Sequence, residues 1–323
     1  MNVLVTGGAG YIGSFMVKKL LERGDEVIVA DSLKRGHKDK VDLRAKFYEG
    51  DLLDADFVEK IFSENKIDCV MHFAAYIAVG ESMQKPGMYF KNNVISTIHL
   101  LDSMQKYKVG RFVFSSTGTV YGSPEKLPTP EDHPKNPENP YSQSKLMVEQ
   151  ILHWYYTIHN IGYVILRYFN AAGGALDGSN GENHNPETHL IPNAIQAAIS
   201  NTEFSLFGGD YDTRDGSAIR DYIHVLDLVD AHILTLEKLQ EQNGEYIYNV
   251  GTGKGSTNKE VVEMVKKISG IDFPISTQDR REGDVAETVA DISKIKSELS
   301  FSPKYSDLET IIKTAWQWHT KKS

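Results

Sequence analysis

The sequence has one cysteine and no hydrophobic run long enough to cross a membrane. Because Cys69 is the only cysteine among 323 residues, an intramolecular disulfide is excluded, and its place in the apolar run 67–75 predicts burial as a small hydrophobe. A membrane-spanning helix needs about 20 predominantly apolar residues in succession. The first residues predict a strand rather than a charged segment with an apolar core, so we expect no signal peptide. These absences favour a cytoplasmic protein.

Positive charge is also scarce. The chain has 35 Lys and Arg residues against 44 Asp and Glu residues, a formal net charge of -9. This balance argues against non-specific binding to nucleic acid. His184 and His189 lie in or beside a polar stretch without other metal-type ligands at suitable spacing, so we predict no metal site.

Glycine is concentrated directly after the first predicted strand. Residues 2–6 are mostly apolar, the segment Gly-Gly-Ala-Gly-Tyr-Ile-Gly follows at 7–13, and a helical pattern begins behind it. Such a turn lets the backbone approach a pyrophosphate, while the helix N-terminus presents N–H groups and the positive end of its dipole. Glycine turns also join strands to helices without any ligand. The position between a strand and a helix favours a dinucleotide site.

Asp31 follows the next predicted strand, residues 26–30. An acid near this spacing accepts hydrogen bonds from the ribose hydroxyls of NAD and repels the 2′-phosphate of NADP. The alternative interpretation is an ordinary turn residue. Lys34 and Arg35 are close enough in sequence to hold a phosphate, but the acid favours NAD.

Strand and helix patterns alternate through the first half of the chain. The predicted strands are 2–6, 26–30, 46–49, 69–73, 111–115 and 163–168, and the amphipathic stretches include 54–64, 87–107 and 141–160. This alternation predicts an α/β fold with a Rossmann-like doubly wound parallel sheet, whose ligands lie at the carboxyl ends of the strands. Residues 171–187 predict a long polar loop, and the remainder predicts a smaller mixed α/β substrate-binding lobe. We expect domains over 1–170 and 171–323, with an approximate boundary because the chain can cross between the lobes.

Tyr141 and Lys145 are the candidates for acid–base chemistry. Pro140 suits a helix start, which places the two side chains on one helix face. A phenol has an ordinary pKa near ~10, and an adjacent ammonium with a cationic nicotinamide ring lowers it toward neutral pH. Such a pair arises by chance in a chain with 16 tyrosines. The glycine turn and the hydroxyl-rich strand end at 115–117 precede it in the chain, and this combined context favours the catalytic interpretation.

These motifs resemble those of the UDP-hexose 4-epimerases, a family of the extended short-chain dehydrogenase/reductase superfamily. The resemblance runs over nearly the whole chain and rests on residues 5–14, 49–51, 72–75, 79–82, 91–94, 141–150, 166–170, 220–225 and 281–284. The glycine and Tyr/Lys motifs mark only the superfamily. The motifs at Arg220 and Arg281 are more specific to nucleotide-sugar enzymes.

The resemblance implies that UDP-glucose and UDP-galactose are interconverted through a transient 4-keto sugar, with tightly bound NAD, in a homodimer packed through 87–107 and 141–160. Tyr141 is then the base, and Lys145 orients the nicotinamide ribose. Thr117 hydrogen-bonds the sugar 4-hydroxyl, at a position where many family members have serine. The implied cofactor site comprises Gly7, Gly10, Tyr11, Ile12, Gly13, Asp31, Asp51, Leu52, Phe73, Ala74, Ala75, Asn92, Ser115, Tyr141, Lys145 and Phe169. The implied substrate site comprises Thr117, Tyr141, Asn170, Leu190, Phe207, Arg220, Arg281, Asp284 and Thr288, and a salt bridge to Asp221 is the alternative interpretation of Arg220.

The chain departs from the family at two positions. Ile77 stands where some members carry a lysine near the cofactor. Thr288 stands where members that reject N-acetyl sugars have a bulky tyrosine, so we hypothesise activity on UDP-N-acetylglucosamine and UDP-N-acetylgalactosamine as well. The alternative functions are another NAD-dependent nucleotide-sugar epimerase or dehydratase, or a non-catalytic NAD sensor. Dehydratases place an Asp-Glu pair after the strand-end threonine, whereas Gly118 and Thr119 follow Thr117 here.

Overall fold

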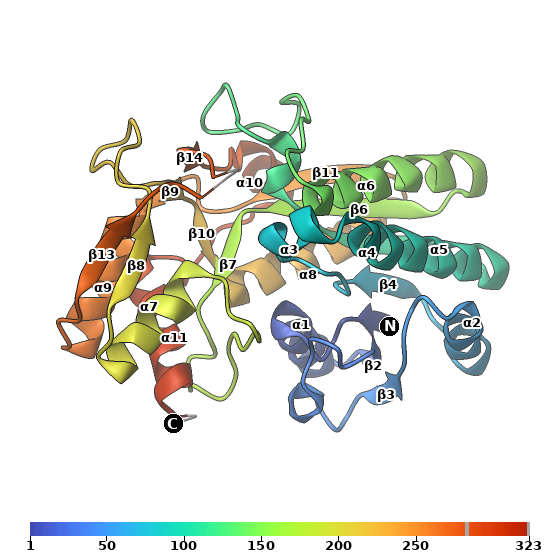
Figure 1. The fold of residues 1–323 in the computed structure, drawn as a ribbon. Coiled ribbons are helices and arrows are strands. Elements are labelled where there is room, and N and C mark those ends of the chain that lie inside the picture. Colours follow the sequence, from blue (N-terminus) through green and yellow to red (C-terminus); the bar gives the residue numbers. More distant parts are fainter. Residues whose placement is uncertain (282–283, 322–323) are drawn as a thin grey trace. The chain divides into compact units, whose positions relative to one another are not determined.

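The computed structural model describes residues 1–281 and 284–321, and the chain forms two compact units (Figure 1). Unit 1 comprises Met1–Tyr121, Lys135–Arg167 and Ala231–Tyr248, and unit 2 comprises Gly122–Pro134, Tyr168–Asp230 and Asn249–Ser323. One crossing, at 167–168, lies near the boundary expected at residue 170. The chain also crosses between the units at 121–122, 134–135, 230–231 and 248–249, so each unit is assembled from separate segments.

Unit 1 is built on a seven-stranded sheet in the order β11-β6-β5-β4-β1-β2-β3. Its strands are β1 (Asn2–Thr6), β2 (Glu26–Asp31), β3 (Lys46–Glu49), β4 (Cys69–His72), β5 (Arg111–Thr117), β6 (Gly162–Tyr168) and β11 (Glu245–Val250). The pairings of β1 with β2, β2 with β3, β1 with β4 and β4 with β5 are parallel. The strand order reverses at β1, the switch point where doubly wound sheets bind their ligands. The predicted fold class is confirmed.

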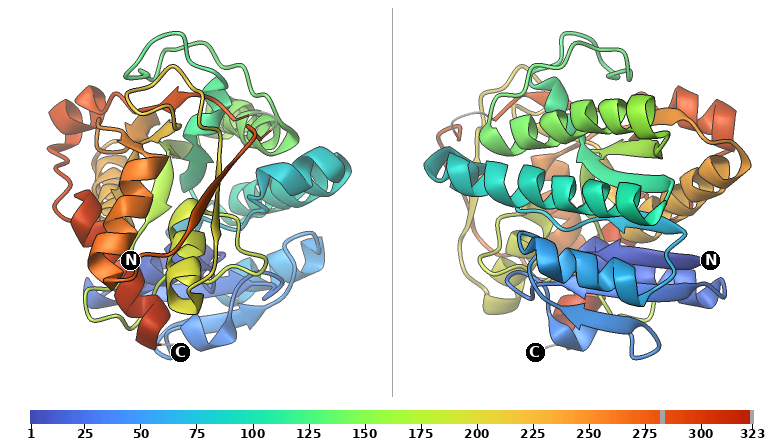
Figure 2. Two further views of the ribbon diagram at one scale, coloured as in Figure 1. Left: turned by 60° about the vertical axis from the view of Figure 1, so that its left-hand side comes forward. Right: turned by 90° about the vertical axis from the view of Figure 1, so that its right-hand side faces the viewer.

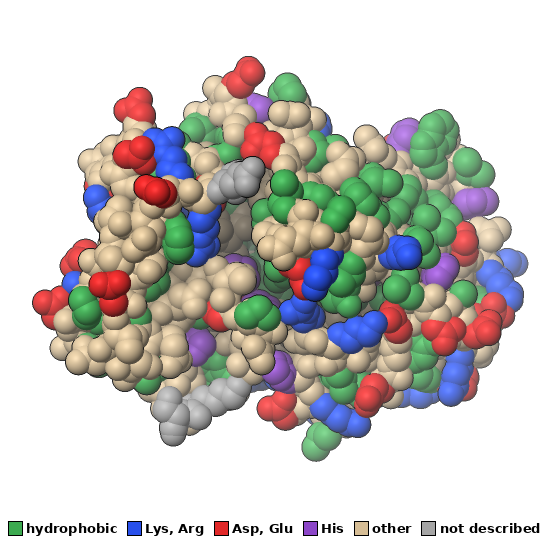
Figure 3. Space-filling model, in the orientation of Figure 1, with side chains coloured by type: hydrophobic (Ala, Val, Ile, Leu, Met, Phe, Trp, Pro, Cys, Tyr) green, Lys and Arg blue, Asp and Glu red, His purple; other side chains and the backbone are tan. Residues whose placement is uncertain are grey.

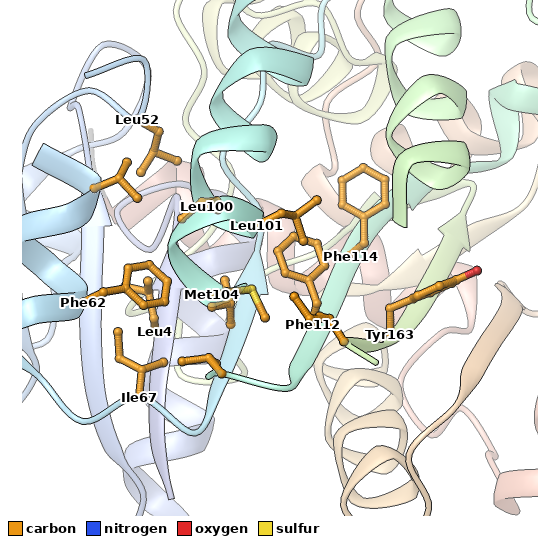
Figure 4. Close-up of a cluster of buried hydrophobic side chains, with 14 of the residues drawn as sticks. Leu4, Leu52, Phe62, Ile67, Leu100, Leu101, Met104, Phe112, Phe114 and Tyr163 are labelled. Atoms are coloured by element: carbon orange, nitrogen blue, oxygen red, sulfur yellow. The ribbon is translucent and has the colours of Figure 1, made fainter. Parts of the chain in front are cut away.

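Both faces of this sheet are buried, as the hydrophobic strand sequences require. On one face, Leu4, Ile28 and Val70 join a core with α2 (Ala55–Glu64), α5 (Ser96–Tyr107) and α6 (Pro140–His159) (Figure 4). The alternate residues Val3, Val5 and Val29 are also fully buried. Side chains alternate between the faces of a strand, and α1 (Tyr11–Glu22) approaches the second face, where a Cβ on Gly8 would lie 2.8 Å from Val29.

The segment predicted as one helix over 87–107 is interrupted. It consists of α4 (Pro86–Phe90), the π-helical turn η2 (Lys91–Ile95) and α5, and α3 (Val79–Gln84) precedes it. A π turn places one extra residue in the helix and is common at functional sites. Helix α6 begins as predicted: Pro140 occupies its first turn, and the Asn139 side chain caps it by accepting from Ser142 N at 2.9 Å.

Unit 2 contains three small sheets, β10-β7, β12-β9-β14 and β13-β8. Their strands are β7 (Asn170–Ala172), β8 (Phe204–Phe207), β9 (Ile219–Arg220), β10 (Tyr222–His224), β12 (Ser256–Thr257), β13 (Ile275–Gln278) and β14 (Glu287–Thr288). Helices α7 (Leu190–Ser200), α9 (Asn258–Ser269) and α11 (Leu308–Lys321) enclose a core that includes Ile195, Val262 and Ile312. The short helix α10 (Ser293–Leu299) and α8 (Val225–Glu241), which runs from unit 2 into unit 1, complete the described helices (Figure 2). Over the described ranges, no helix is long and apolar enough to cross a membrane.

Candidate functional site

The glycine turn after β1 has the close packing that a dinucleotide site requires. Gly7 has a φ of +73°, and a Cβ there would lie 2.6 Å from Ala74 N. A Cβ on Gly13 would lie 2.1 Å from Gly7 O, so the first turn of α1 packs directly on the loop. Gly10 occupies the N-cap position without a side-chain cap. The residues therefore fit a pyrophosphate at the N-terminus of α1.

Asp31 is the last residue of β2, and its side chain hydrogen-bonds the backbone of this glycine turn. Its carboxylate accepts hydrogen bonds from Ala9 N at 3.0 Å and from Leu33 N at 2.9 Å. Burial raises the pKa of Asp31, while the two backbone donors oppose that rise. Each carboxylate oxygen can accept more than one hydrogen bond, so the group can still receive ribose hydroxyls.

The cations near Asp31 have acidic partners. Lys34 pairs with Asp51 at 2.6 Å, and Arg35 pairs with Glu81 at 2.9 Å. Asp51 also accepts a hydrogen bond from Leu53 N at 3.0 Å, which fixes the turn that holds the buried Leu52. These pairings neutralise the two side chains that could otherwise attract the 2′-phosphate of NADP.

The segment after β4 is held by a buried asparagine that sequence reasoning missed. Asn93, 3% exposed, donates to Tyr76 O and to Ser144 Oγ, each at 3.0 Å, and accepts from Tyr76 N at 2.9 Å. The predicted cofactor residue Asn92 donates to Asn93 Oδ1 at 3.0 Å. Asn93 thus ties the chain after Phe73, Ala74 and Ala75 to helix α6. Two asparagines inside a predicted helix were the available signal, because asparagine is a poor helix former.

Thr117 and Tyr141 come together in unit 1. Burial raises the pKa of Tyr141 to about 12, and the Thr117 side chain opposes that rise. Thr117 Oγ1 also lies 3.0 Å from Thr119 Oγ1, which accepts from Ser142 Oγ at 2.7 Å. This hydroxyl chain fixes the orientation of Thr117 against α6. Thr119 and Ser142 are further positioning residues that the sequence did not single out.

Lys145 lies one turn beyond Tyr141, with 2% of its surface exposed. Its ammonium donates to Ser115 O at 2.8 Å and lies 4.9 Å from the centre of the Phe114 ring. Burial lowers the pKa of Lys145 to about 7, and the negative charge of Glu149 opposes that fall. Lys145 is therefore attached to the end of β5.

Glu149, four residues after Lys145 on α6, forms a buried ion pair with Arg167. Arg167 donates to Glu149 from Nε at 3.0 Å and from a terminal nitrogen at 2.6 Å, and also reaches the Tyr121 hydroxyl at 2.9 Å. Ser116 Oγ donates to the same carboxylate at 2.5 Å. Glu149 therefore connects α6, β5 and β6. The sequence contained no spacing signal for a pair 18 residues apart on different elements.

Unit 2 contains a cavity of about 330 Å³ that is lined in part by four of the predicted substrate residues. Leu190, Phe207, Arg281 and Asp284 line it, together with polar groups that include Asn193 and Asn258. The guanidinium carbon of Arg281 lies 4.0 Å from the centre of the Phe207 ring. A cationic group over an aromatic ring, with polar side chains around it, suits an anionic ligand that has a planar base. Of the motif at 281–284, residues 282 and 283 lie outside the described part of the chain.

The nearest acidic partner of Arg220 differs from the Asp221 salt bridge of the alternative interpretation. Arg220 lies 3.6 Å from Asp284 rather than pairing with its neighbour Asp221. Asp221 is fully buried and accepts from Thr252 N at 2.8 Å, Gly253 N at 3.1 Å and Ala290 N at 3.2 Å. Asp221 is thus a structural group of the loop at 251–253, and Arg220 keeps a partly exposed guanidinium.

Three other predicted residues occupy neighbouring elements of unit 2. Thr288 is half-buried on β14 and pairs in register with Arg220 on β9. Asn170 begins β7, and its side chain donates to Asp221 O at 3.2 Å. Phe169 lies between β6 and β7 and is half-buried. None of these three is among the residues that line the cavity.

The structure overturns the reason for excluding a metal. The sequence analysis found no further ligands near His184 and His189, but Glu182 and Glu187 approach both histidines, with all four ligand atoms within 4.8 Å of one another. Sequence spacing missed this cluster because the loop that forms it has no periodic structure.

Comparisons with known proteins agree with this geometry. The family model described as NAD dependent epimerase/dehydratase family matches residues 3–251. The UDP-glucose 4-epimerase of Lactobacillus helveticus is 49% identical over 320 residues, which cover 99% of this chain and 97% of that protein.

Two solved structures share the fold over the same extent. The crystal structure of UDP-glucose 4-epimerase from Bifidobacterium longum in complex with NAD+ and UDP is 38% identical, with a TM-score of 0.95, and the match covers 99% of this chain and 98% of that one. The UDP-Glc/GlcNAc 4-epimerase of Campylobacter jejuni is 40% identical, with a TM-score of 0.87 and 99% coverage of both chains.

Proposed function

Because the chain belongs to the NAD dependent epimerase/dehydratase family, we propose that it interconverts UDP-glucose and UDP-galactose by inverting C4 of the hexose. The observation that carries the proposal is the buried Lys145, which lies one helical turn from Tyr141 and hydrogen-bonds the end of the strand that carries Thr117, in a chain whose full length matches UDP-glucose 4-epimerases. The absence of a carboxylate at residues 118 and 119 favours epimerisation over dehydration.

Tyr141 is the proposed base that removes the proton of the C4 hydroxyl. Thr117 orients that hydroxyl, and its own orientation is fixed through Thr119 and Ser142. Because burial raises the pKa of Tyr141 to about 12, deprotonation at neutral pH requires nearby positive charge. Lys145 supplies part of this charge, and Glu149 favours the charged form of that lysine.

The residues around the glycine turn fit NAD. Gly7, Gly10 and Gly13 would leave space for the pyrophosphate at α1, Asp31 would accept hydrogen bonds from the ribose hydroxyls, and Lys145 would hold the nicotinamide ribose. What bound NAD supplies is a positive charge and reversible hydride exchange at C4 through a transient 4-keto sugar. Because the exchange is redox-neutral overall, NAD stays bound through the cycle.

The unit 2 cavity is the proposed nucleotide site. Arg281, stacked on Phe207, and Arg220 bind the anionic diphosphate and uridine, since a guanidinium forms paired, charge-assisted hydrogen bonds. Leu190 lines the same cavity, whereas Arg220 and Asn170 lie outside its lining and would reach the nucleotide from β9 and β7. Holding the UDP group leaves the hexose free to turn about the diphosphate and present either face of C4.

We also propose that the substrate range extends to UDP-N-acetylglucosamine and UDP-N-acetylgalactosamine. Thr288 is smaller than the tyrosine of family members that reject N-acetyl sugars, which leaves volume for an acetamido group. The name of the Campylobacter jejuni relative, a UDP-Glc/GlcNAc 4-epimerase, supports such a range in this family.

The proposed assembly is a homodimer in the cytoplasm. Helices α5 and α6 lie side by side (Figure 2), and hydrophobic side chains gather over α3, α4, α5 and α6 (Figure 3). Ile95, Trp154 and Ile158 are 41%, 59% and 66% exposed there. Apolar surface of this kind favours burial against a second subunit. The single buried thiol suits a reducing compartment.

The test is conversion of UDP-galactose by the purified protein without added NAD, followed by chromatographic separation of the two UDP-hexoses. We expect UDP-glucose to form and NAD to be released on denaturation. UDP-N-acetylgalactosamine is assayed in parallel. If neither substrate is converted, even with NAD added, the proposed reaction is wrong, and a sensor or another nucleotide sugar becomes the better interpretation.

A further inference from the structure

The Glu182–His189 segment carries four side chains whose ligand atoms converge, and the proposed reaction uses none of them. The group consists of Glu182, His184, Glu187 and His189, called the His/Glu cluster below. We propose that the His/Glu cluster binds one Zn²⁺ ion. This proposal goes beyond epimerisation and does not depend on it.

The ligand atoms of the His/Glu cluster lie close together, most of them at hydrogen-bond separations. His184 Nδ1 lies 3.0 Å from Glu182 Oε1 and 3.9 Å from Glu187 Oε2. His189 Nδ1 lies 2.6 Å from Glu182 Oε1 and 3.1 Å from Glu187 Oε1. In a tetrahedral site with ligand bonds of about 2.0–2.2 Å, neighbouring ligand atoms are about 3.3–3.6 Å apart. Bound zinc would therefore widen the three shorter separations and narrow the longest one, each by at most about 1 Å, in a cluster whose ligand atoms all lie within 4.8 Å of one another.

The donor set and its charge also favour zinc. Two imidazole nitrogens and two carboxylates are ordinary zinc ligands, whereas Ca²⁺ and Mg²⁺ prefer oxygen ligands alone. Two carboxylates and one dication sum to zero when both histidines are neutral. Glu182 is 6% exposed and lies 2.6 Å from His189 Nδ1, so zinc would take over from the histidines the compensation that a buried carboxylate needs. Four protein ligands leave no open position, which is typical of a structural rather than a catalytic zinc.

The surroundings hold the ligands in place. Trp318 Nε1 on α11 donates to Glu182 O at 2.8 Å. Glu187 Oε1 accepts from Thr188 N at 2.8 Å and from His189 N at 2.9 Å. His189 is also the N-cap residue of α7. Zinc would therefore link the loop to α7, directly before Leu190, and stabilise the wall of the cavity that Thr188 and Leu190 line.

The experiment measures zinc binding by the full-length protein. After treatment with a chelator and removal of the chelator, isothermal titration with ZnCl₂ should give one site per chain. Co²⁺ should give the visible absorption of a four-coordinate ion and quench tryptophan fluorescence, because Trp318 contacts the cluster. Zinc should also raise the thermal unfolding temperature, since it binds only the folded cluster.

His184→Gln and His189→Gln should each lower the zinc affinity at least about tenfold, because even outer-shell partners of metal ligands contribute that much. The matched control is His153→Gln, which removes another His–Glu pair, at 2.7 Å from Glu245, and should leave zinc binding unchanged. Circular dichroism verifies that each variant is folded. No site with one-to-one stoichiometry, or binding equal in the cluster variants and the control, would show that the cluster is only a charged hydrogen-bond network.

Discussion

Lys145 donates a hydrogen bond to the main-chain oxygen of Ser115 at 2.8 Å. Ser115 lies two residues before Thr117 on β5, and Lys145 lies four residues after Tyr141 on α6. The bond therefore fixes the helix that carries the phenol against the strand that carries the threonine hydroxyl. Because one lysine both joins these elements and supplies charge, its substitution would disturb position and electrostatics together, and tests of the base must use other residues.

Tyr141→Phe isolates the proton-transfer role. We expect kcat for UDP-galactose epimerisation to fall about 10²–10⁴-fold, the range for loss of a general acid–base group, while the fold survives. The measurement is steady-state kinetics with circular dichroism and a melting curve. Tyr155→Phe is the control, because this tyrosine lies on the same helix and bonds the exposed Asp102. Comparable activity in the two variants would contradict the assignment of Tyr141.

Glu149→Gln tests the buried ion pair. Loss of one partner leaves Arg167, 1% exposed, with an uncompensated charge, which costs about 3–5 kcal/mol in buried pairs. Chemical unfolding should register a loss of this order. Glu59→Gln breaks an exposed pair with Lys106 and should change stability by less than about 1 kcal/mol. Equal losses in both variants would mean that burial does not distinguish the pairs.

His72 makes stability depend on pH. It bridges Thr6 Oγ1 at 2.6 Å and Thr97 Oγ1 at 3.0 Å, and burial lowers its pKa to about 3 with a further contribution from Lys145. The unfolded chain therefore binds a proton near pH 6.5 that the folded protein excludes, and stability falls as pH drops from about 6.5 toward 3. The slope contributed by one such group is at most about 1.4 kcal/mol per pH unit.

The check is urea unfolding of wild type and His72→Gln between pH 4.5 and 7. This range includes the ordinary pKa of an unfolded histidine, about 6.5. The variant should be less stable at pH 7 but show a flatter dependence on pH. Parallel profiles would assign the acid sensitivity to other groups, of which His224, with a pKa lowered by burial to about 4, is the next to substitute.

Arg281→Ala tests the nucleotide site. Loss of the guanidinium should weaken UDP binding roughly 10- to 100-fold, equivalent to about 1.5–3 kcal/mol for hydrogen bonds to a charged group. Isothermal titration with UDP gives the dissociation constant. The neighbouring Arg280 is the control, since it stacks on Tyr211 and pairs with the exposed Asp210 at 2.8 Å. If Arg280→Ala weakens UDP binding as strongly, general positive charge rather than the cavity holds the nucleotide.

The features that sequence predicted are those that depend on neighbouring residues. The first strand has the bounds expected, because an apolar β-branched run ends at a glycine turn. The glycine packing and the strand-end position of Asp31 follow from the same local pattern. Tyr141 and Lys145 could be paired in advance because helical spacing alone places them on one face.

The features that sequence missed depend on the folded chain. The π turn at residues 91–95 lies inside an amphipathic stretch, and only its two adjacent asparagines hinted at an interruption. Glu149 and Arg167 meet only because α6 packs against β6. The His/Glu cluster is formed by a loop without periodicity, and residues 231–248 join unit 1 through long-range packing. For the ion pair and for residues 231–248 the information lies in tertiary contacts, whereas for the cluster it lies in the conformation of an aperiodic loop.

Thr288→Tyr tests the substrate range. A bulkier side chain on β14 should remove the volume that an acetamido group occupies, so activity on UDP-N-acetylgalactosamine should fall at least about tenfold while activity on UDP-galactose changes little. A tenfold difference corresponds to about 1.4 kcal/mol, within the range for overpacking a filled site. Thr288→Ser is the matched control, because it keeps the pocket open and the hydroxyl in place. Parallel kcat/KM measurements on both sugars separate the outcomes: loss of both activities would mean that residue 288 supports the neighbouring Arg220 rather than selecting the sugar.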